Sequence, residues 1–317
     1  MPNTMTFAFT SARMPHHLRR EEGGEAPERK REHKSVMAAE ALSALAVKDG
    51  EVVVDATYGR GGHSAALKKT VKIKLIALDA DPVRSLASNG TGPAVIEANF
   101  ADLQEVLKKL GITEVNKVLF DLGWNMTQLQ SGRGFSFMRD EPLNMSYAAS
   151  PRSGFTAAEA LNFWSEETLA DVLFGYGEER YARRIAKAIV VRRKVQPFAT
   201  TNELVEVVRD AVPAAYRRGR INPATKTFQA LRIAVNDELG CLKQGLSSAW
   251  EALTPGGRIA VITFHSIEDR IVKRYFASLA KEGAGKLLYK KPLAPSAAEI
   301  KSNPASRSAK LRAIEKI

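Results

Sequence analysis

Residues 51–69, EVVVDATYGRGGHSAALKK, decide the fold of this chain. Glu51 to Asp55 is a β-branched apolar run that ends in an acid, which is typical of a buried parallel strand. A glycine-rich turn follows it, and Ser64 to Lys69 then has helix-forming composition. Strand, glycine turn and helix N-terminus form the unit in which backbone N–H groups can approach a nucleotide-like ligand. The stretch therefore predicts a strand–turn–helix unit of an α/β fold.

The glycine pattern of the turn narrows the class of ligand. No Gly-Lys-Ser/Thr follows, so the turn is not a phosphate-binding P-loop, and ATP hydrolysis is disfavoured. Ser64 fills the third glycine position of a dinucleotide fingerprint. Gly59 and Gly61, counted from Asp55, are placed more like the first motif of S-adenosylmethionine-dependent methyltransferases. A dinucleotide enzyme remains the alternative on this turn alone.

Further strand ends carry candidate binding residues. A strand over 75–78 ends at Asp79, at about the spacing where a carboxylate accepts hydrogen bonds from ribose hydroxyls. A third strand leads to Phe100, and a fourth ends at Asp121. Ligands of open α/β sheets lie across the carboxyl ends of the strands, so these residues and Gly61 are expected to converge. For Phe100, an ordinary place in the core is the alternative.

The alternation of strands and helices stops after Ser131 and resumes near residue 225. Helices are predicted between these points at 156–162, 166–174, 178–193 and 201–212. Beyond them we predict a helix over 225–253, a turn at 254–257, a strand over 258–264 and a helix over 267–279, with the tail closing the sheet as a hairpin. The predicted organisation is a disordered extension (1–32), an α/β domain (33–134 and 221–317) and an inserted helical domain (135–220).

The net charge of +12 is unevenly distributed. Residues 180–232 hold 13 Lys and Arg against 3 acids, and residues 281–317 hold 9 against 3, so the remainder is slightly acidic. This predicts a polyanion-binding face on the insert. A solvated helix face without a partner is the alternative. The candidate RNA-binding residues are Arg183, Arg184, Arg192, Arg193 and Lys194.

Composition points to a soluble protein of a reducing compartment, which favours the cytoplasm. The chain has 317 residues, is 44% hydrophobic, and contains no apolar run long enough to cross a bilayer. Its single cysteine, Cys241, can form neither an internal disulfide nor a thiolate metal cage. The first 20 residues contain Arg13 but no acid, which leaves an organelle transit peptide as an alternative for the extension.

From His33 to Ile317 the chain resembles the bacterial ribosomal RNA small-subunit methyltransferase H family, also called MraW. The segments that carry the resemblance are DATYGRGGHS, ALDADP, DLG with Gln128, RGFSFMRDEPL, YGEERYARRIAKAI, TKTFQALRIAVNDEL, PGGRIAVITFHSIEDRIVK and NPASRSAKLR. The resemblance implies a class I (Rossmann-like) S-adenosylmethionine-dependent methyltransferase fold with an inserted all-helical domain. It also implies methylation of the exocyclic N4 of one cytidine in the decoding centre of 16S rRNA, within the small ribosomal subunit.

The resemblance also implies roles for individual residues. The cofactor-binding positions fall on Gly61, Gly62 and His63 in the turn, Asp79 at the ribose, Phe100 beside the adenine, and Asp121 and Gln128 near the methionine end. For catalysis, an acceptor that orients the amino group is needed, because the lone pair of cytosine N4 is delocalised into the ring. Asp121 and His265 are the candidates, with a structural cap as the alternative for His265. No metal is expected, since the five histidines are scattered.

Two segments depart from the family pattern. The family usually has Val-Ser-Ser-Pro after DLG, where this chain has Trp124 to Thr127. It usually has Asp-Met-Arg-Met after Pro-Leu, where this chain has Asn144 to Tyr147. Both are expected near the target base. They leave open a degenerate relative that binds cofactor and rRNA without methyl transfer.

Overall fold

The computed structural model describes residues 34–81, 94–123, 126–149 and 151–317, and residues 33–317 form one compact unit. The expectations for the N-terminal extension, Trp124 and Asn125 lie outside these residues. The strands are β1 (Val52–Asp55), β2 (Lys74–Asp79), β3 (Val95–Glu97), β4 (Val115–Asp121), β5 (Leu253–Thr263), β6 (Gly285–Leu287) and β7 (Lys310–Lys316). The helices of the α/β part are α1 (Ala38–Leu45), α2 (Gly62–Thr70), α3 (Leu103–Lys109), α4 (Met126–Leu129), α11 (Glu238–Ala252), α12 (Ser266–Lys281) and α13 (Ala297–Ser302).

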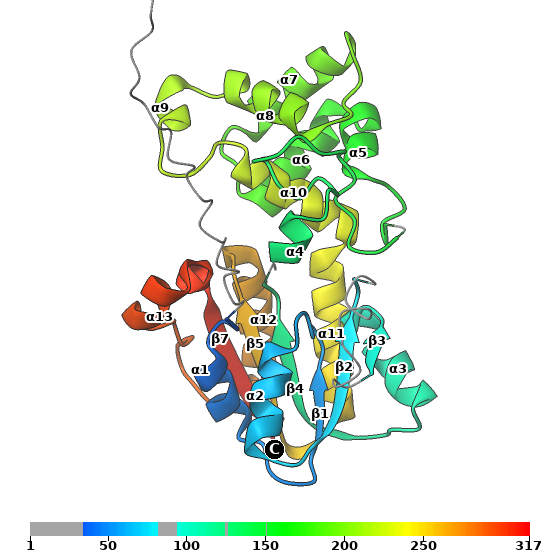
Figure 1. The fold of residues 1–317 in the computed structure, drawn as a ribbon, viewed down its shortest axis with the longest axis vertical. Coiled ribbons are helices and arrows are strands. Elements are labelled where there is room, and N and C mark those ends of the chain that lie inside the picture. The colour runs from blue at the N-terminus through cyan, green and yellow to red at the C-terminus, as the bar shows by residue number, and fades with distance from the viewer. Residues whose placement is uncertain (1–33, 82–93, 124–125, 150) are drawn as a thin grey trace, which may run out of the picture. The chain divides into compact units, whose positions relative to one another are not determined.

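The strands form one sheet in the order β3-β2-β1-β4-β5-β7-β6. The first five strands of this order are parallel, and β7 pairs antiparallel with both β5 and β6. The order reverses between β1 and β4, which is the switch point where open α/β sheets bind ligands. The predicted methyltransferase-type α/β fold and the closing hairpin of the tail are confirmed (Figure 1).

Helices cover both faces of the sheet. Alternate residues of a strand point to opposite faces, and both sets of residues in the central strands are apolar. Val118 and Phe120 of β4 belong to a buried cluster with residues of α3, α11 and α12, whereas Leu119 belongs to a second cluster with residues of α1. The sheet is therefore buried on both faces, which explains the near-continuous apolar composition of its central strands.

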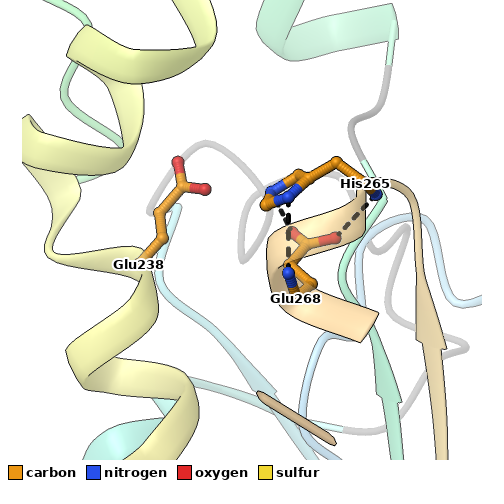
Figure 2. Close-up of side chains that lie close together, drawn as sticks. All are labelled: Glu238, His265 and Glu268. Atoms are coloured by element: carbon orange, nitrogen blue, oxygen red, sulfur yellow. Dashed lines mark hydrogen bonds and ion pairs between the residues drawn. The ribbon is translucent and has the colours of Figure 1, made fainter. Parts of the chain in front are cut away.

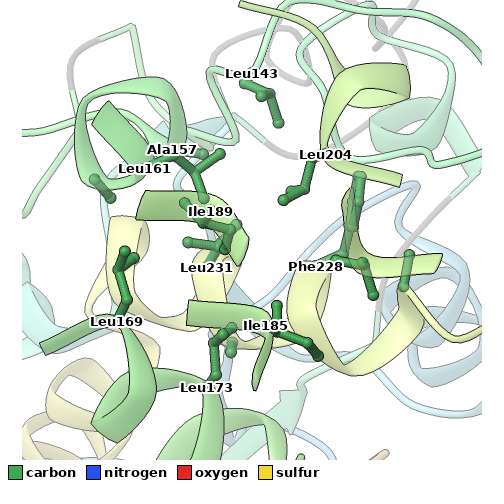
Figure 3. Packing of buried hydrophobic residues seen from close by; sticks show 14 of the residues in the cluster. Leu143, Ala157, Leu161, Leu169, Leu173, Ile185, Ile189, Leu204, Phe228 and Leu231 are labelled. Atoms are coloured by element: carbon green, nitrogen blue, oxygen red, sulfur yellow. The ribbon is translucent and has the colours of Figure 1, made fainter. Parts of the chain in front are cut away.

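The helical insert lies between β4 and β5 and has a core of its own. Its helices are α5 (Ala157–Phe163), α6 (Glu166–Gly177), α7 (Ala182–Arg193), α8 (Thr201–Ala211) and α9 (Ala214–Arg217). Figure 3 shows Leu161, Leu173 and Ile189 of these helices packed with Phe228 and Leu231 of α10 (Thr225–Asn236). The buried core of the insert includes residues of α10, which lies beyond residue 220. The domain boundary at residue 220 therefore stays a prediction.

The single helix predicted over 225–253 is wrong. The chain forms α10 and α11, which are separated at Asp237, a residue with φ of 46° in the left-handed region. The interruption is not marked by glycine or proline, so composition did not reveal it. It matters for the site because it turns Glu238, the first residue of α11, toward the end of the sheet.

Candidate functional site

A cavity lies at the carboxyl ends of β1, β2 and β4. The empty space at this place, part of which is open to solvent, amounts to about 810 Å³. The lining residues are Ala56, Thr57, Gly59, Asp79, Ala80, Asp81, Asn99, Phe100, Asp121, Leu122, Gly123, Gln128, Tyr147, Asn236, Glu238, Cys241, Leu242 and Glu268. Of the predicted site residues, the structure therefore brings together Asp79, Phe100, Asp121 and Gln128.

Asp79 ends β2 and is held by the backbone of two loops. Its Oδ2 accepts from the Gly59 amide at 2.7 Å, and its Oδ1 accepts from the Asp81 amide at 2.9 Å. These bonds fix the carboxylate at the rim of the cavity and tie β2 to the glycine turn. A carboxylate presented in this way is suited to accept hydrogen bonds from a ligand with neighbouring hydroxyl groups.

Gly61 and Gly62 pack closely against side chains of the protein. A Cβ on Gly61, whose φ is 73°, would overlap the Tyr58 ring, and one on Gly62 would overlap the Ser35 hydroxyl. Neither glycine lines the cavity among the described residues, nor does His63, whereas Thr57 and Gly59 of the same turn do. Gly59 belongs to the glycine motif described in the sequence, whereas Thr57 was not among the predicted site residues, and contact of Gly61–His63 with a cofactor stays a prediction.

Asp55 explains why a serine occupies the third glycine position. The Ser64 hydroxyl donates to Asp55 Oδ2 at 2.5 Å, and the Thr57 amide lies 3.3 Å from Oδ1. Burial raises the pKa of Asp55, although the Ser64 hydrogen bond opposes the rise. Ser64 thus anchors the start of α2 to the end of β1, which a glycine could not do.

His63 and Asp121 form a pair beside the cavity. His63 Nε2 lies 3.2 Å from Asp121 Oδ2, and the imidazole is almost wholly buried. Burial lowers the pKa of His63, but the hydrogen bond and charge of Asp121 outweigh it, so the net pKa is raised. The imidazolium form is therefore favoured next to Asp121.

Phe100 and Cys241 supply apolar lining. Phe100 meets Phe120 edge-to-face at 5.6 Å, and α11 approaches its ring so closely that a Cβ on Gly245 would lie 2.7 Å from Cδ2. Burial raises the pKa of Cys241 to about 11, so the thiol stays neutral. Phe100 therefore combines the two roles that sequence reasoning left open, because it packs in the core and also lines the cavity.

At the far end of the cavity, the sequence led us to expect the segment that contains Tyr147, but Glu238 and Glu268 were missed. This end is lined by Tyr147, from the loop before α5, and by Glu238 and Glu268, from the starts of α11 and α12. Behind Glu238 lies Arg232, whose Nε and NH2 are 2.6 and 2.8 Å from the two carboxylate oxygens. Burial and Glu238 raise the pKa of Tyr147 well above its usual value, so it acts as a neutral hydroxyl.

His265 is the N-cap of α12, the alternative that the sequence left open. Its Nδ1 accepts from the Glu268 amide at 3.4 Å, while Glu268 Oε2 accepts from the His265 amide at 3.3 Å and the Phe264 amide at 2.9 Å. This reciprocal arrangement is a capping box. His265 itself is not among the cavity-lining residues, and its catalytic role stays a prediction.

Glu238, His265 and Glu268 offer three ligand atoms that all lie within 4.8 Å of one another. Figure 2 shows these three side chains close together. Each already has protein partners. Arg232 and Tyr147 hold Glu238, while backbone amides hold Glu268. The adjacent guanidinium also opposes a cation, so the group fits a hydrogen-bonded network better than a metal centre.

The five predicted RNA-binding residues lie at α7 and fall into two groups. Arg183, Arg184 and Lys194 are exposed. Arg193 instead donates to the Leu161 and Trp164 carbonyls at 2.8 and 2.7 Å. Arg192 contacts the Gln196 carbonyl and Glu203, and it lies over the Phe198 ring. Only the first group offers charges that face solvent, and RNA binding by all five stays a prediction.

Asn144 does not line the cavity. Its Oδ1 accepts from the Ser146 amide at 2.8 Å, which closes a local turn, and the next residue, Met145, is buried with φ of 59°. Asn144 thus shapes the loop that carries Tyr147 into the cavity. The segment from Asn144 to Tyr147, which departs from the family pattern, therefore contributes Tyr147 to the lining of the cavity.

Comparison with known proteins gives the family. The model of the MraW methylase family matches residues 30–317. The chain belongs to this family. It is 44% identical over 310 residues to the ribosomal RNA small subunit methyltransferase H of Heliobacterium modesticaldum, covering 90% of this chain and 98% of that protein. It is 46% identical over 292 residues to the protein of the same name from Coprothermobacter proteolyticus, covering 90% and 96%.

A solved structure of another methylase was also compared with this chain. An rRNA methylase from Streptococcus thermophilus is similar with a TM-score of 0.39 and 13% identity, covering 92% of this chain and 99% of that chain. Because the identity and the TM-score are both low, we base no functional argument on this structural similarity.

Within the described ranges, no helix is both long and apolar enough to span a membrane.

Proposed function

We propose that this protein transfers a methyl group from S-adenosylmethionine to the exocyclic N4 of a cytidine in small-subunit (16S) rRNA. Membership of the MraW methylase family over residues 30–317 is the observation that carries the proposal. The cavity at the switch point of the sheet supports it, because a carboxylate, an aromatic edge and a second carboxylate line one continuous space. We propose the cytoplasm as its compartment and the small ribosomal subunit as its partner.

The donor set of the cavity fits the cofactor. Asp79 would accept from the ribose hydroxyls, Phe100 would lie against the adenine, and Asp121 would attract the cationic amino-acid end, with Gln128 nearby. The cofactor supplies a methyl group on a positively charged sulfur. The protein's own task is to hold the target amine in line with that methyl group.

Nucleoside analysis of 16S rRNA tests the proposal. Small subunits from cells with and without the gene are digested, and N4-methylated cytidine is measured by mass spectrometry. Purified protein and cofactor are then added to the deficient subunits. We expect the modification to disappear with the gene and to return on addition. If cofactor binds but no methyl group is transferred, the protein is a degenerate relative that binds without turnover.

A further inference from the structure

Glu238 presents a fixed carboxylate to the cavity. Arg232 contacts both of its oxygens, at 2.6 Å to Oε1 and 2.8 Å to Oε2, and the Tyr147 hydroxyl donates to Oε1 at 3.0 Å. The Arg232 side chain is 2% exposed, whereas that of Glu238 is 14% exposed and lines the cavity. Arg232 therefore lies behind the carboxylate, whereas Glu238 and its second partner, Tyr147, line the same cavity as Asp79 and Phe100.

Stability alone does not account for this arrangement. Burying an arginine costs desolvation energy, and a buried ion pair is often no more stabilising than apolar residues of the same size. The Arg232 guanidinium and the Tyr147 hydroxyl instead hold the Glu238 carboxylate, a charged hydrogen-bond acceptor, in one position. Such pre-organisation suits a group that binds a ligand.

The other carboxylates of the cavity have different tasks. Glu268 Oε2 accepts two amides of the α12 N-terminus, so it is committed to the capping box. Asp121 is paired with His63 at 3.2 Å. Asp79, at the end of β2, accepts hydrogen bonds from two backbone amides. Glu238 is thus the carboxylate placed at the far end for a second ligand.

The chemistry of the nucleobase edge identifies that ligand. Cytosine presents an N4 amino group as donor, and carboxylates accept from it, whereas uracil presents an oxygen that a carboxylate repels. We propose that Glu238 binds the N4 amino group of the target cytosine, selecting cytosine over uracil and aiming N4 at the methyl donor. This inference rests on the proposed function and assigns the residue that reads the base.

The group transfer balances with Glu238 as a hydrogen-bond acceptor. The N4 lone pair forms the new N–C bond, while the carbon–sulfur bond breaks and its electron pair stays on sulfur. N4 then carries a positive charge, and it loses one of its two hydrogens as a proton to water. The second hydrogen stays on N4 and donates a hydrogen bond to the Glu238 carboxylate. Arg232 and Tyr147 act through Glu238 and are positioning residues.

The test compares Glu238→Gln with Glu251→Gln, a matched change at an exposed position of the same helix. Methyl transfer to cytidine N4 is measured on small subunits from cells that lack the gene, and cofactor affinity is measured by calorimetry. For Glu238→Gln we expect kcat/KM to fall about 10- to 100-fold, as for loss of a specific base contact, with cofactor affinity within about twofold. Glu251→Gln should match the wild type.

A second variant separates positioning from folding. Tyr147→Phe removes one hydroxyl and leaves both charges paired. We expect kcat to fall about two- to fivefold, with the KM for subunits and the cofactor affinity unchanged, because Glu238 loses one of its contacts. A merely structural role of Tyr147 would lower the unfolding temperature and leave kcat unchanged.

The outcomes distinguish the two proposals. If the wild type methylates no cytidine, the proposed function fails and takes this inference with it. If the wild type is active and Glu238→Gln is equally active, only the inference is overturned. A Glu238→Gln protein that loses transfer and cofactor affinity together also overturns it, since Glu238 would then support the whole cavity rather than bind the base.

Discussion

The two ends of the cavity are built differently. The end proposed for the cofactor is formed at the ends of parallel strands, and it includes Asp79, the last residue of β2, and Asp121, the last residue of β4. The end proposed for the base is lined by Tyr147, which lies in a loop, and by Glu238, which lies at the break between α10 and α11, with Arg232 of α10 behind Glu238. The first set is placed by the topology of the sheet. The second is placed by packing of the insert-side loop against α10 and α11.

This difference explains what the sequence could predict. Strand ends meet at one edge of any parallel sheet, so the sequence could predict that Asp79, Phe100 and Asp121 converge, and these residues line one cavity. Tyr147 and Glu238 are 91 positions apart and were not connected by any local pattern. Their contact depends on the turn at Asp237, a left-handed residue in a stretch with continuous helical composition.

The charged helix α7 shows the same limit. Periodicity correctly placed its arginines on a helix, but it did not distinguish Arg183, which faces solvent, from Arg193, which bonds to two carbonyls. The acceptors of Arg193 are about 30 residues earlier, in and after α5. Charge counts therefore predicted a basic surface larger than the exposed one.

The largest effect is expected at the cofactor end. Asp79→Ala removes a charged acceptor, and a hydrogen bond to a charged group contributes about 1.5–3 kcal/mol. We expect the Kd for S-adenosylmethionine to rise about 10- to 100-fold in calorimetry. Asp171→Ala, at an exposed position of α6, is the control. Unchanged affinity in Asp79→Ala would show that the strand-end assignment is wrong.

A smaller effect should separate the two kinds of arginine on α7. Arg193→Ala should lower the free energy of unfolding by about 1–2 kcal/mol, because two carbonyls lose a charged donor. Arg183→Ala should change it by less than about 0.5 kcal/mol. Urea denaturation measures both.

The same pair should behave oppositely in RNA binding. Arg183→Ala is expected to reduce the log–log salt slope of rRNA binding by about 0.7–0.9, the contribution of one phosphate contact. Arg193→Ala should leave the slope unchanged, because its guanidinium is already bound to the protein. Equal slopes for the wild type and Arg183→Ala would remove Arg183 from the RNA surface.

The smallest effect concerns pH at the cofactor end. The folded pKa of His63 is raised by Asp121 despite the opposing effect of burial, with further contributions from Asp55 and Glu299. Protonated His63 therefore stabilises the fold below the unfolded pKa of about 6.5, and this contribution is lost as pH rises through the folded pKa. The stability difference between wild type and His63→Gln should be largest below about pH 6 and shrink above it.

Urea denaturation of both proteins across this pH range measures the difference, and Asp121→Asn serves as the control because it removes the partner. A difference that grows with pH would mean that burial dominates and that His63 is neutral. If the difference shrinks as expected, the positive charge on His63 is withdrawn from Asp121 as pH rises. Asp121 then becomes a stronger acceptor for the cationic end of the cofactor, so cofactor affinity should rise over the range in which His63 loses its contribution to stability.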